Sequence, residues 1–372
     1  MRSLEASGLK RALHPPAGID LSSNDYLGLA DHPQVKAAMA AAVEREGAGS
    51  TGSRLLRGDR DSFAMLERRF AQFKGTERAL YFSSGYLANI AVMTTFAEAG
   101  DVVISDQSNH ASLIDGMRLS SARREIVPHN EVSAVRAALE GNGAGGAGGE
   151  CFLVVESLFS MDGDEAPLTQ YAELCRQTGA HLIVDEAHAV GMYGARGSGL
   201  IEEHDVAEHV LLSVNTAGKA LGVCGAFVAG PAWAIEYLLQ RARPFIFSTA
   251  PPPSVASALY ASLTIVEHEP DRREHVRGLA AALRQRLSAA GVPTGGGRSH
   301  IVPIRIGDNE AAVTVAELLQ RDGFDVRAIR PPTVPPGTAR LRVSVNAHLT
   351  ADVIERFAVS LISALTRVGV RA

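Results

Sequence analysis

Short apolar runs alternate with amphipathic stretches between Ala30 and about Tyr260. Each run holds about four or five apolar residues without regular alternation, which is typical of strands buried on both faces of a parallel sheet. The expected strands are Ala79–Phe82, Val102–Ile104, Phe152–Val155, Leu182–Val184, Val210–Val214 and Ala226–Ala229. The expected helices between them include Asp61–Phe73, Tyr86–Thr95, Glu131–Glu140, Leu168–Gln177 and Pro231–Arg241. This order predicts an α/β domain with ligands at the carboxyl ends of its strands.

The pattern changes from about Glu269. The elements expected there are a helix (Arg272–Ala290), a strand (His300–Ile306), a helix (Ala311–Asp322), a strand pair around Val326 and at Leu341–Val345, and a last helix from Ala351. We therefore expect an N-terminal arm at residues 1–29, a large α/β domain at 30–262 and a smaller α+β domain at 263–372. Gly141–Gly149 has too few side chains to pack and is expected to be a surface loop.

Composition and charge narrow the classes of partner. The formal net charge is −5 and the pI is near 6.2, which argues against a nucleic-acid or anionic-membrane surface. The pairs Arg68-Arg69 and Arg123-Arg124 are short and are expected on solvated helix faces. No apolar run approaches the roughly 20 residues of a membrane span, and Met1–Ile19 does not resemble a signal peptide. The cytoplasm is the expected compartment.

The three cysteines lack the spacing of metal ligands, and an odd number does not make a disulfide framework. Cys151, Cys175 and Cys224 each lie beside apolar residues. We therefore expect three reduced, buried thiols and no metal site.

A carboxylate and a histidine follow one of the expected buried strands. Asp185 comes where the strand Leu182–Val184 ends, and His188 follows three residues later. A carboxylate at this end of a strand faces the ligand crevice of an α/β sheet. A helix N-cap and a structural histidine are an equally good interpretation of this pair by itself.

A lysine lies in a glycine-containing loop between two expected strands. Lys219 is flanked by Thr216, Gly218 and Gly222. A lysine is usually a solvated surface charge, but glycines allow the backbone to bend close to a ligand and present the amine inward. Lys219 is 34 residues from Asp185 (219 − 185), enough for a helix and a strand, so the two residues could reach one crevice.

Two further segments suggest how a flat phosphorylated ligand would be held. The strand Ala79–Phe82 leads through Ser84-Gly85-Tyr86 directly into a helix, whose N-terminal N–H groups could bind phosphate. His110 follows the strand Val102–Ile104 and could stack on an aromatic ring. An ordinary strand–turn–helix and an ordinary loop histidine are the alternatives.

The four features together match one cofactor. A phosphate site, a stacking ring, a carboxylate for a pyridine nitrogen and an amine for an aldehyde are what pyridoxal 5′-phosphate (PLP) requires. The carboxylate would keep the ring nitrogen protonated, and the lysine would form the Schiff base and later move the Cα proton.

With these motifs the chain resembles the α-oxoamine synthases, a branch of the fold-type I PLP enzymes. The similarity runs from SNDYLGL at Ser23 to RLRVSVNAH at Arg340–His348. The other shared motifs are GAGSTGSRLLRG (Gly47–Gly58), SNHASLIDG, ESLFSMDGD (Glu156–Asp164), DEAHAVG, the lysine loop and FSTAPPP (Phe247–Pro253). The resemblance implies a mostly parallel, seven-stranded sheet between helices, with a smaller C-terminal α+β domain.

The resemblance also implies roles for individual residues. Lys219 would bind the PLP aldehyde, Asp185 the pyridine nitrogen and His188 the 3-oxygen, with His110 stacked on the ring. The other implied cofactor contacts are Gly85, Tyr86, Thr216 and Ser160, together with Ser248 and Thr249 of the neighbouring subunit in a homodimer. The implied substrate contacts are Glu156, Thr333, Arg342 and a basic residue near the N-terminus, Lys10 or Arg11, of which we favour Arg11. Phe63 departs from the family, which commonly has a histidine there.

The stretch Ile329–Val345 resembles the biotin-pathway branch of the family. This implies L-alanine and a pimeloyl thioester, carried on coenzyme A or on acyl carrier protein, as the substrates. A sister enzyme that uses glycine or another acyl thioester is the nearest alternative. An NAD enzyme is disfavoured because no G-x-G-x-x-G follows the first strands, and a non-catalytic binding protein is disfavoured because Asp185, His188, Lys219 and Arg342 are all present.

Overall fold

The fold was analysed in a computed structural model, which describes residues 9, 13–142 and 149–370. The chain divides into two compact units. The larger unit comprises Gly28–Phe159 and Glu165–Pro270, and the smaller comprises Met1–Leu27, Ser160–Asp164 and Asp271–Ala372. The expected domain boundaries at residues 29/30 and 262/263 stay a prediction.

The larger unit is built on a seven-stranded sheet with the order β2-β8-β7-β6-β5-β3-β4. Its strands are β2 (Arg78–Phe82), β3 (Val102–Asp106), β4 (Arg123–Val127), β5 (Cys151–Glu156), β6 (His181–Asp185), β7 (Val210–Thr216) and β8 (Ala226–Gly230). Neighbouring strands are parallel except that β8 runs antiparallel to both β2 and β7. The predicted mostly parallel α/β sheet is confirmed.

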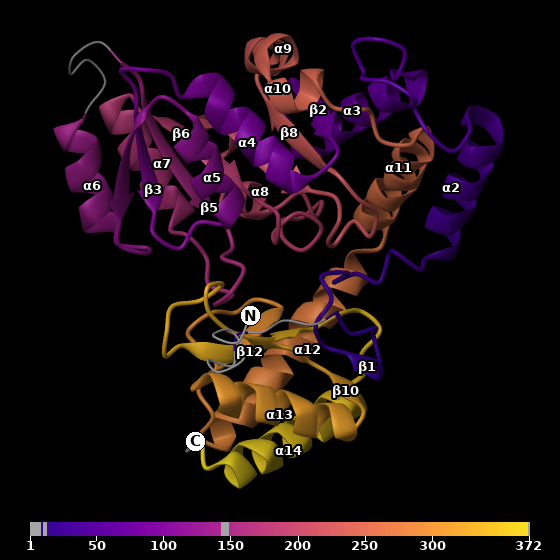
Figure 1. The fold of residues 1–372 in the computed structure, drawn as a ribbon, viewed down its shortest axis with the longest axis vertical. Coiled ribbons are helices and arrows are strands. Elements are labelled where there is room, and N and C mark those ends of the chain that lie inside the picture. The colour runs from indigo at the N-terminus through magenta and orange to yellow at the C-terminus, as the bar shows by residue number, and fades with distance from the viewer. Residues whose placement is uncertain (1–8, 10–12, 143–148, 371–372) are drawn as a thin grey trace. The chain divides into compact units, whose positions relative to one another are not determined.

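Helices bury both faces of this sheet. Helix α4 (Gly85–Phe96), α5 (Ala111–Leu119) and α9 (Ala232–Arg241) pack on one face, against side chains such as Val154 and Val214. Helices α4 and α5 lie side by side (Figure 1). On the other face, Phe70 of α3 (Asp61–Lys74) stacks on Phe227 of β8 at 3.9 Å between ring centroids. This burial explains why β5 and β8 carry no exposed position.

The remaining helices of the larger unit connect or flank these layers. They are α2 (Pro33–Glu46), α6 (Val132–Gly141), α7 (Leu168–Thr178), α8 (Leu200–Glu203), the 3-10 turn η1 (Ala207–His209), α10 (Arg243–Ile246) and α11 (Pro253–His268). Helices α2 and α11 pack together (Figure 1). No helix in the described residues is long and apolar enough to cross a membrane.

Two sequence-based expectations are wrong in the larger unit. Arg123-Arg124 lies not on a helix face but at the start of β4, the edge strand next to β3. This strand was missed because its residues are mostly exposed, and charged side chains are how natural proteins protect an edge strand from further pairing. Cys224 is exposed, whereas Cys151 and Cys175 are buried as expected.

The smaller unit has two small sheets. β9 (Ile301–Gly307), β11 (Ala328–Ile329) and β12 (Ala339–Ser344) form an antiparallel sheet with the order β11-β12-β9. β1 (Ile19–Asp20) pairs in parallel with β10 (Phe324–Asp325). The helices are α12 (Pro270–Ala289), α13 (Asn309–Arg321) and α14 (Ala351–Val368). The three expected helices and the strands β9 and β12 are present, whereas Val326, expected in a strand, lies between the short strands β10 and β11. Strand β1 joins the N-terminal segment to this unit by pairing with β10.

Candidate active site

The site begins at the carboxyl ends of two neighbouring strands. Asp185 is the last residue of β6 and Glu156 the last residue of β5, and the two are register partners. Both are buried, with 4% and 2% of their surfaces exposed. The Ser157 N–H donates to the Asp185 carbonyl at 2.8 Å, which holds the chain together just past the strand ends.

Two neutral donors orient the Asp185 carboxylate. Asn89 on α4 donates its side-chain N–H to Oδ2 at 2.7 Å, and the Ala187 backbone N–H donates to Oδ1 at 2.8 Å. The Asn89 amide cannot be turned around, because its oxygen would then face a carboxylate oxygen. Both donors are uncharged, so these hydrogen bonds orient the Asp185 carboxyl group without placing a cation against it.

A short hydrogen-bond chain runs from Asn89 to His110. The same Asn89 nitrogen donates to the Ser112 hydroxyl oxygen at 2.9 Å. The Ser112 oxygen lies 2.7 Å from His110 Nδ1, and the Ser112 backbone N–H donates to that same nitrogen at 3.2 Å. Because the backbone N–H can only donate, Nδ1 accepts, and the Ser112 O–H donates to it as well. The imidazole proton of His110 is therefore on Nε2.

The surroundings of His110 keep its ring neutral. Although the residue reaches the surface, the buried environment of the ring lowers the pKa of His110 below its ordinary value, and the nearby Lys219 amine acts in the same direction. The carboxylates of Asp185 and Asp115 oppose this change in pKa. A neutral ring suits stacking on another aromatic system, since no charge has to be desolvated.

The lysine loop presents Lys219 at the end of β7. Hydrogen bonds from Ala217 N–H to the Gly225 carbonyl and from Gly222 N–H to the Lys219 carbonyl, both 2.8 Å, close the turn. Gly222 has φ +68°, and a Cβ there would lie 2.5 Å from the Ala30 nitrogen, so this position requires glycine. The half-buried Lys219 amine lies 2.8 Å from His188 Nε2.

The N-terminus of α4 and the end of β7 form the next part of the site. The Ser84 hydroxyl caps α4 by accepting from the Leu87 N–H at 3.2 Å. A Cβ on Gly85 would lie 2.5 Å from the Thr216 hydroxyl, so Gly85 and Thr216 are in close contact. Helix N–H groups beside a hydroxyl form a suitable anion site, because the helix dipole and free donors point the same way. Tyr86 is partly exposed and donates its hydroxyl to Asp115.

The structure thus brings together, within the larger unit, residues that the sequence predicted separately. Asp185, His110, Lys219 and His188 are linked by the contacts above, and Gly85 adjoins Thr216. Asn89 and Ser112 were missed by sequence reasoning. The one signal in the sequence was Asn89 itself, a polar residue within the apolar helix sequence YLANIAVM. A buried amide needs hydrogen-bond partners, so its presence there indicated a polar contact.

In the smaller unit, Arg342 of β12 is buried and makes four hydrogen bonds. Its Nε donates to the Ser160 carbonyl at 2.5 Å, and its Nη1 donates to Asn24 Oδ1 at 3.0 Å and to the Ser344 hydroxyl at 2.8 Å. Its Nη2 donates to the Tyr26 hydroxyl at 3.0 Å. A planar guanidinium has five N–H groups, so four are directed at protein oxygens in this arrangement.

The other residues singled out from the sequence lie in loops, in the core or outside the described residues. Thr333 is exposed and its N–H donates to the Arg330 carbonyl at 3.1 Å. Ser248 and Thr249 lie in the loop between α10 and α11. Arg11 and its alternative Lys10 are outside the described residues. Phe63 is fully buried on α3 with the Arg54 guanidinium 4.6 Å from its ring centroid, so it is a core residue.

Comparison with known proteins identifies the family. Residues 16–361 match the family described as aminotransferase class I and II. An 8-amino-7-oxononanoate synthase from Geobacter sulfurreducens is 44% identical over 385 aligned residues, which cover 99% of this chain and 96% of that protein. The chain belongs to the 8-amino-7-oxononanoate synthases of this family.

Solved structures agree with the assignment. A serine palmitoyltransferase from S. paucimobilis with a bound PLP–myriocin aldimine has a TM-score of 0.93 at 31% identity, covering 100% of this chain and 96% of that one. An 8-amino-7-oxononanoate synthase from Francisella tularensis has a TM-score of 0.82 at 28% identity, covering 94% and 98%. The fold is therefore that of the fold-type I PLP transferases.

Proposed function

We propose that this protein condenses L-alanine with a pimeloyl thioester, with loss of CO2 and the free thiol, to give 8-amino-7-oxononanoate in biotin biosynthesis. The observation that carries the proposal is the pair of contacts that join Lys219 to His188 and, through Asn89 and Ser112, Asp185 to His110 in the larger unit. Membership of the 8-amino-7-oxononanoate synthases supports the same reaction.

The residues present fit PLP as the cofactor. The Lys219 amine lies 2.8 Å from a nitrogen of His188. The turn that carries Lys219 contains glycines and no proline. Asp185 has a buried carboxylate whose hydrogen-bond donors are neutral, which is suited to a protonated pyridine nitrogen. The capped N-terminus of α4 beside Thr216 is suited to the phosphate.

Bound PLP supplies an electron sink for the carbanion that forms at Cα of the amino acid. Asp185 keeps the pyridine nitrogen protonated, because an adjacent carboxylate favours the charged form of that group. Lys219 provides the amine that holds the cofactor aldehyde in the resting enzyme. With the amino acid bound, the free Lys219 amine would take the proton from the alanine Cα and later return a proton.

The histidines assist in different ways. His110, neutral with its proton on Nε2, stacks on the cofactor ring and keeps water from that face. His188 lies against the Lys219 amine and would donate a hydrogen bond to the 3-oxygen of bound PLP. Gly85, Tyr86 and Thr216 serve the phosphate, and Ser160 lies beside the cofactor.

Substrate contacts complete the proposal. Arg342 binds the alanine carboxylate, and its four protein contacts imply that the substrate replaces at least one of them to obtain a bidentate pair. Glu156 would lie by the thioester substrate and Thr333 would contact substrate, and a basic residue near the N-terminus, Arg11 or its alternative Lys10, would meet the acyl group. The enzyme works as a homodimer in which Ser248 and Thr249 reach the phosphate of the neighbouring subunit.

The acyl group is carried by coenzyme A or by acyl carrier protein, and steady-state kinetics with the two pimeloyl thioesters distinguish these carriers. Alanine and glycine differ by one methyl group, which gives only about 1–3 kcal/mol of discrimination. Exchange of the Cα proton, measured with each amino acid, and product assays with pimeloyl and acetyl thioesters test the specificity directly.

The central test replaces Lys219 by alanine. Lys219→Ala should abolish turnover and the visible absorption band of the Schiff base that the lysine forms with the cofactor, because the other described lysines are held elsewhere: Lys74 is in a buried ion pair and Lys36 is paired with Asp31. Lys36→Ala is the matched control and should keep both. A Lys219→Ala variant that retained the band would disprove the assignment.

A further inference from the structure

A pocket lies in the larger unit at the amino ends of the strands, the end opposite to Asp185 and Glu156. Asp101 immediately precedes β3 and Glu150 immediately precedes β5, so both are at the amino ends of parallel strands. Asp185 and Glu156 are at the carboxyl ends of the same sheet. The pocket has a volume of about 410 Å³, within the range of small-molecule sites.

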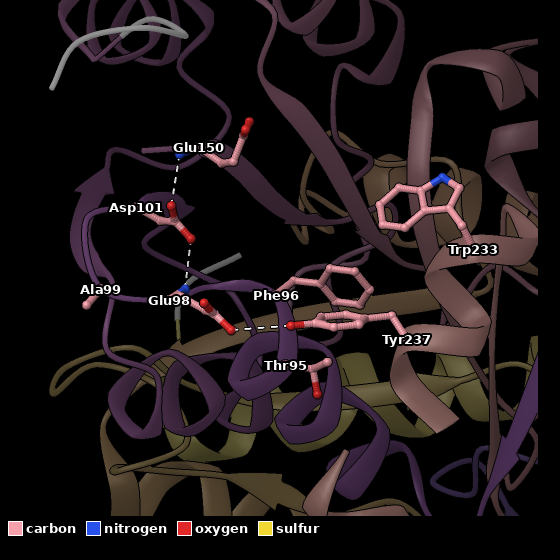
Figure 2. A pocket seen from close by; sticks show the side chains of 8 residues that line it. All are labelled: Thr95, Phe96, Glu98, Ala99, Asp101, Glu150, Trp233 and Tyr237. Carbon is pink, nitrogen blue, oxygen red and sulfur yellow. Dashed lines mark hydrogen bonds between the residues drawn. The ribbon is translucent and has the colours of Figure 1, made fainter. Parts of the chain in front are cut away.

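Three aromatic rings form one side of this pocket, as Figure 2 shows. Trp233 and Tyr237 are one helical turn apart on α9, and Phe96 is the last residue of α4. The ring of Phe96 meets the ring of Trp233 at 76° with centroids 6.2 Å apart, and the ring of Tyr237 at 62° and 5.6 Å. Trp233 is 60% exposed, a large apolar surface for the only tryptophan of the chain.

Carboxylates form the other side. Glu98, Asp101 and Glu150 line the pocket, and no lysine or arginine is among its lining residues in the described structure. Asp101 accepts from the backbone N–H groups of Glu98 and Glu150, both at 2.8 Å, and so fixes the two segments that carry the other carboxylates. Glu98 itself is 60% exposed and accepts a long hydrogen bond of 3.4 Å from the Tyr237 hydroxyl.

The chain's own Arg241 shows what this chemistry attracts. Its guanidinium carbon lies 5.7 Å from the Tyr237 ring centroid, and its Nη2 lies 3.7 Å from Glu98 Oε1. A cation is thus attracted at once to an aromatic face and to a carboxylate of the pocket. The side chain of Arg241 is exposed, and an exposed ion pair at this distance from Glu98 contributes little binding energy.

We propose that this pocket binds a small organic cation of the alkylammonium or quaternary ammonium class. Aromatic rings set at steep angles attract such a cation through their negative faces, and the adjacent carboxylates add a charge attraction without requiring a hydrogen-bond donor from the ligand. The pocket's volume suits a free small molecule. The site is separate from the condensation reaction and does not depend on the proposed function.

The single tryptophan makes the test direct. The holoenzyme is titrated with choline while the emission of Trp233 is recorded, with sodium chloride added to keep the ionic strength constant. Choline should change the emission in a saturable way. Its neutral isostere 3,3-dimethyl-1-butanol should bind more weakly than choline by at least about tenfold. No saturable change with choline, or equal binding of the isostere, would overturn the proposal.

Three variants locate the effect in this pocket. Glu98→Gln should weaken choline binding by about threefold, as expected for one exposed charge. Glu236→Gln, on α9 with Trp233 and Tyr237 but not lining the pocket, removes a carboxylate of similar exposure and should leave binding unchanged. Arg241→Ala should tighten binding, because a competing cation is removed. Equal effects of Glu98→Gln and Glu236→Gln would show a nonspecific charge effect and refute the site.

Discussion

Two consecutive carboxylates at the end of β6 have opposite surroundings. Asp185 receives hydrogen bonds from neutral groups, the Asn89 amide and the Ala187 N–H. Glu186 turns to the other side and forms a buried ion pair with Lys74 at 2.5 Å, both side chains being almost completely buried. The Ile201 N–H also donates to Glu186 at 3.0 Å.

The difference separates a functional charge from a structural one. The charge of Glu186 is cancelled by Lys74, whose amine also donates to the Ser198 carbonyl at 2.6 Å, so the pair binds α3 to the segment after β6. The charge of Asp185 is oriented but not cancelled by its hydrogen-bond partners. This difference fits the proposed role of Asp185 as the partner of a cofactor nitrogen, whereas the charge of Glu186 is already compensated by Lys74.

The largest expected effect is on stability, through Glu186. Glu186→Gln would leave the Lys74 charge buried without its partner, and the free energy of unfolding should fall by about 3–5 kcal/mol. Urea denaturation of the holoenzyme measures this loss. Glu236→Gln removes one partner of an exposed pair and should cost about 0–1 kcal/mol. Equal losses in the two variants would contradict the structural role of the Lys74–Glu186 pair.

The second effect is on turnover, through Asp185. Asp185→Asn removes the charge but keeps the shape, and kcat should fall by about 10²–10³-fold, as for the loss of one preorganised electrostatic contact. The free energy of unfolding should fall by only about 1–2 kcal/mol, because one hydrogen-bond acceptor is lost. Asp31→Asn, on the surface, should change neither quantity. If Asp185→Asn lost stability but kept its turnover, Asp185 would have the structural role that is assigned to Glu186.

The smallest effect concerns the hydrogen bonds that reach His110 from Asn89. Ser112→Ala removes the hydroxyl that donates to Nδ1, so protonation of that nitrogen becomes easier and the pKa of His110 should rise toward its ordinary value. The ring of His110 becomes protonated, and so loses its neutral form, as the pH falls through its pKa. The acid limb of the kcat/KM profile should therefore move to higher pH, with a loss of a few-fold at neutral pH.

Proton and nitrogen NMR of His110 checks the same point independently. The wild-type ring should carry its proton on Nε2, and the Ser112→Ala variant should titrate at a higher pH. Ser108→Ala, in the same loop but bonded through its backbone to Asp106, should leave the titration unchanged. A wild-type ring with its proton on Nδ1 would contradict the hydrogen-bond assignment.

Much of the larger unit could be predicted because burial on both faces leaves a continuous apolar signal. The six strands expected from the sequence are present within one or two residues, and Asp185 ends β6 as expected. The edge strand β4 has no such signal, since Arg123 and Arg124 are exposed. The polar residue Asn89 could be noticed but not interpreted, because its partners Asp185 and Ser112 are distant in sequence.

The sequence by itself determined the fold class, the family and the residue types needed for PLP chemistry, because these depend on local periodicity and on motifs of fixed spacing. Only the tertiary structure decided which of two adjacent carboxylates is charge-compensated, which nitrogen of His110 carries the proton, and that Cys224 is exposed. These properties depend on neighbours brought in from other strands and helices. A residue's chemistry is set by its partners in space, and those partners do not appear in its sequence neighbourhood.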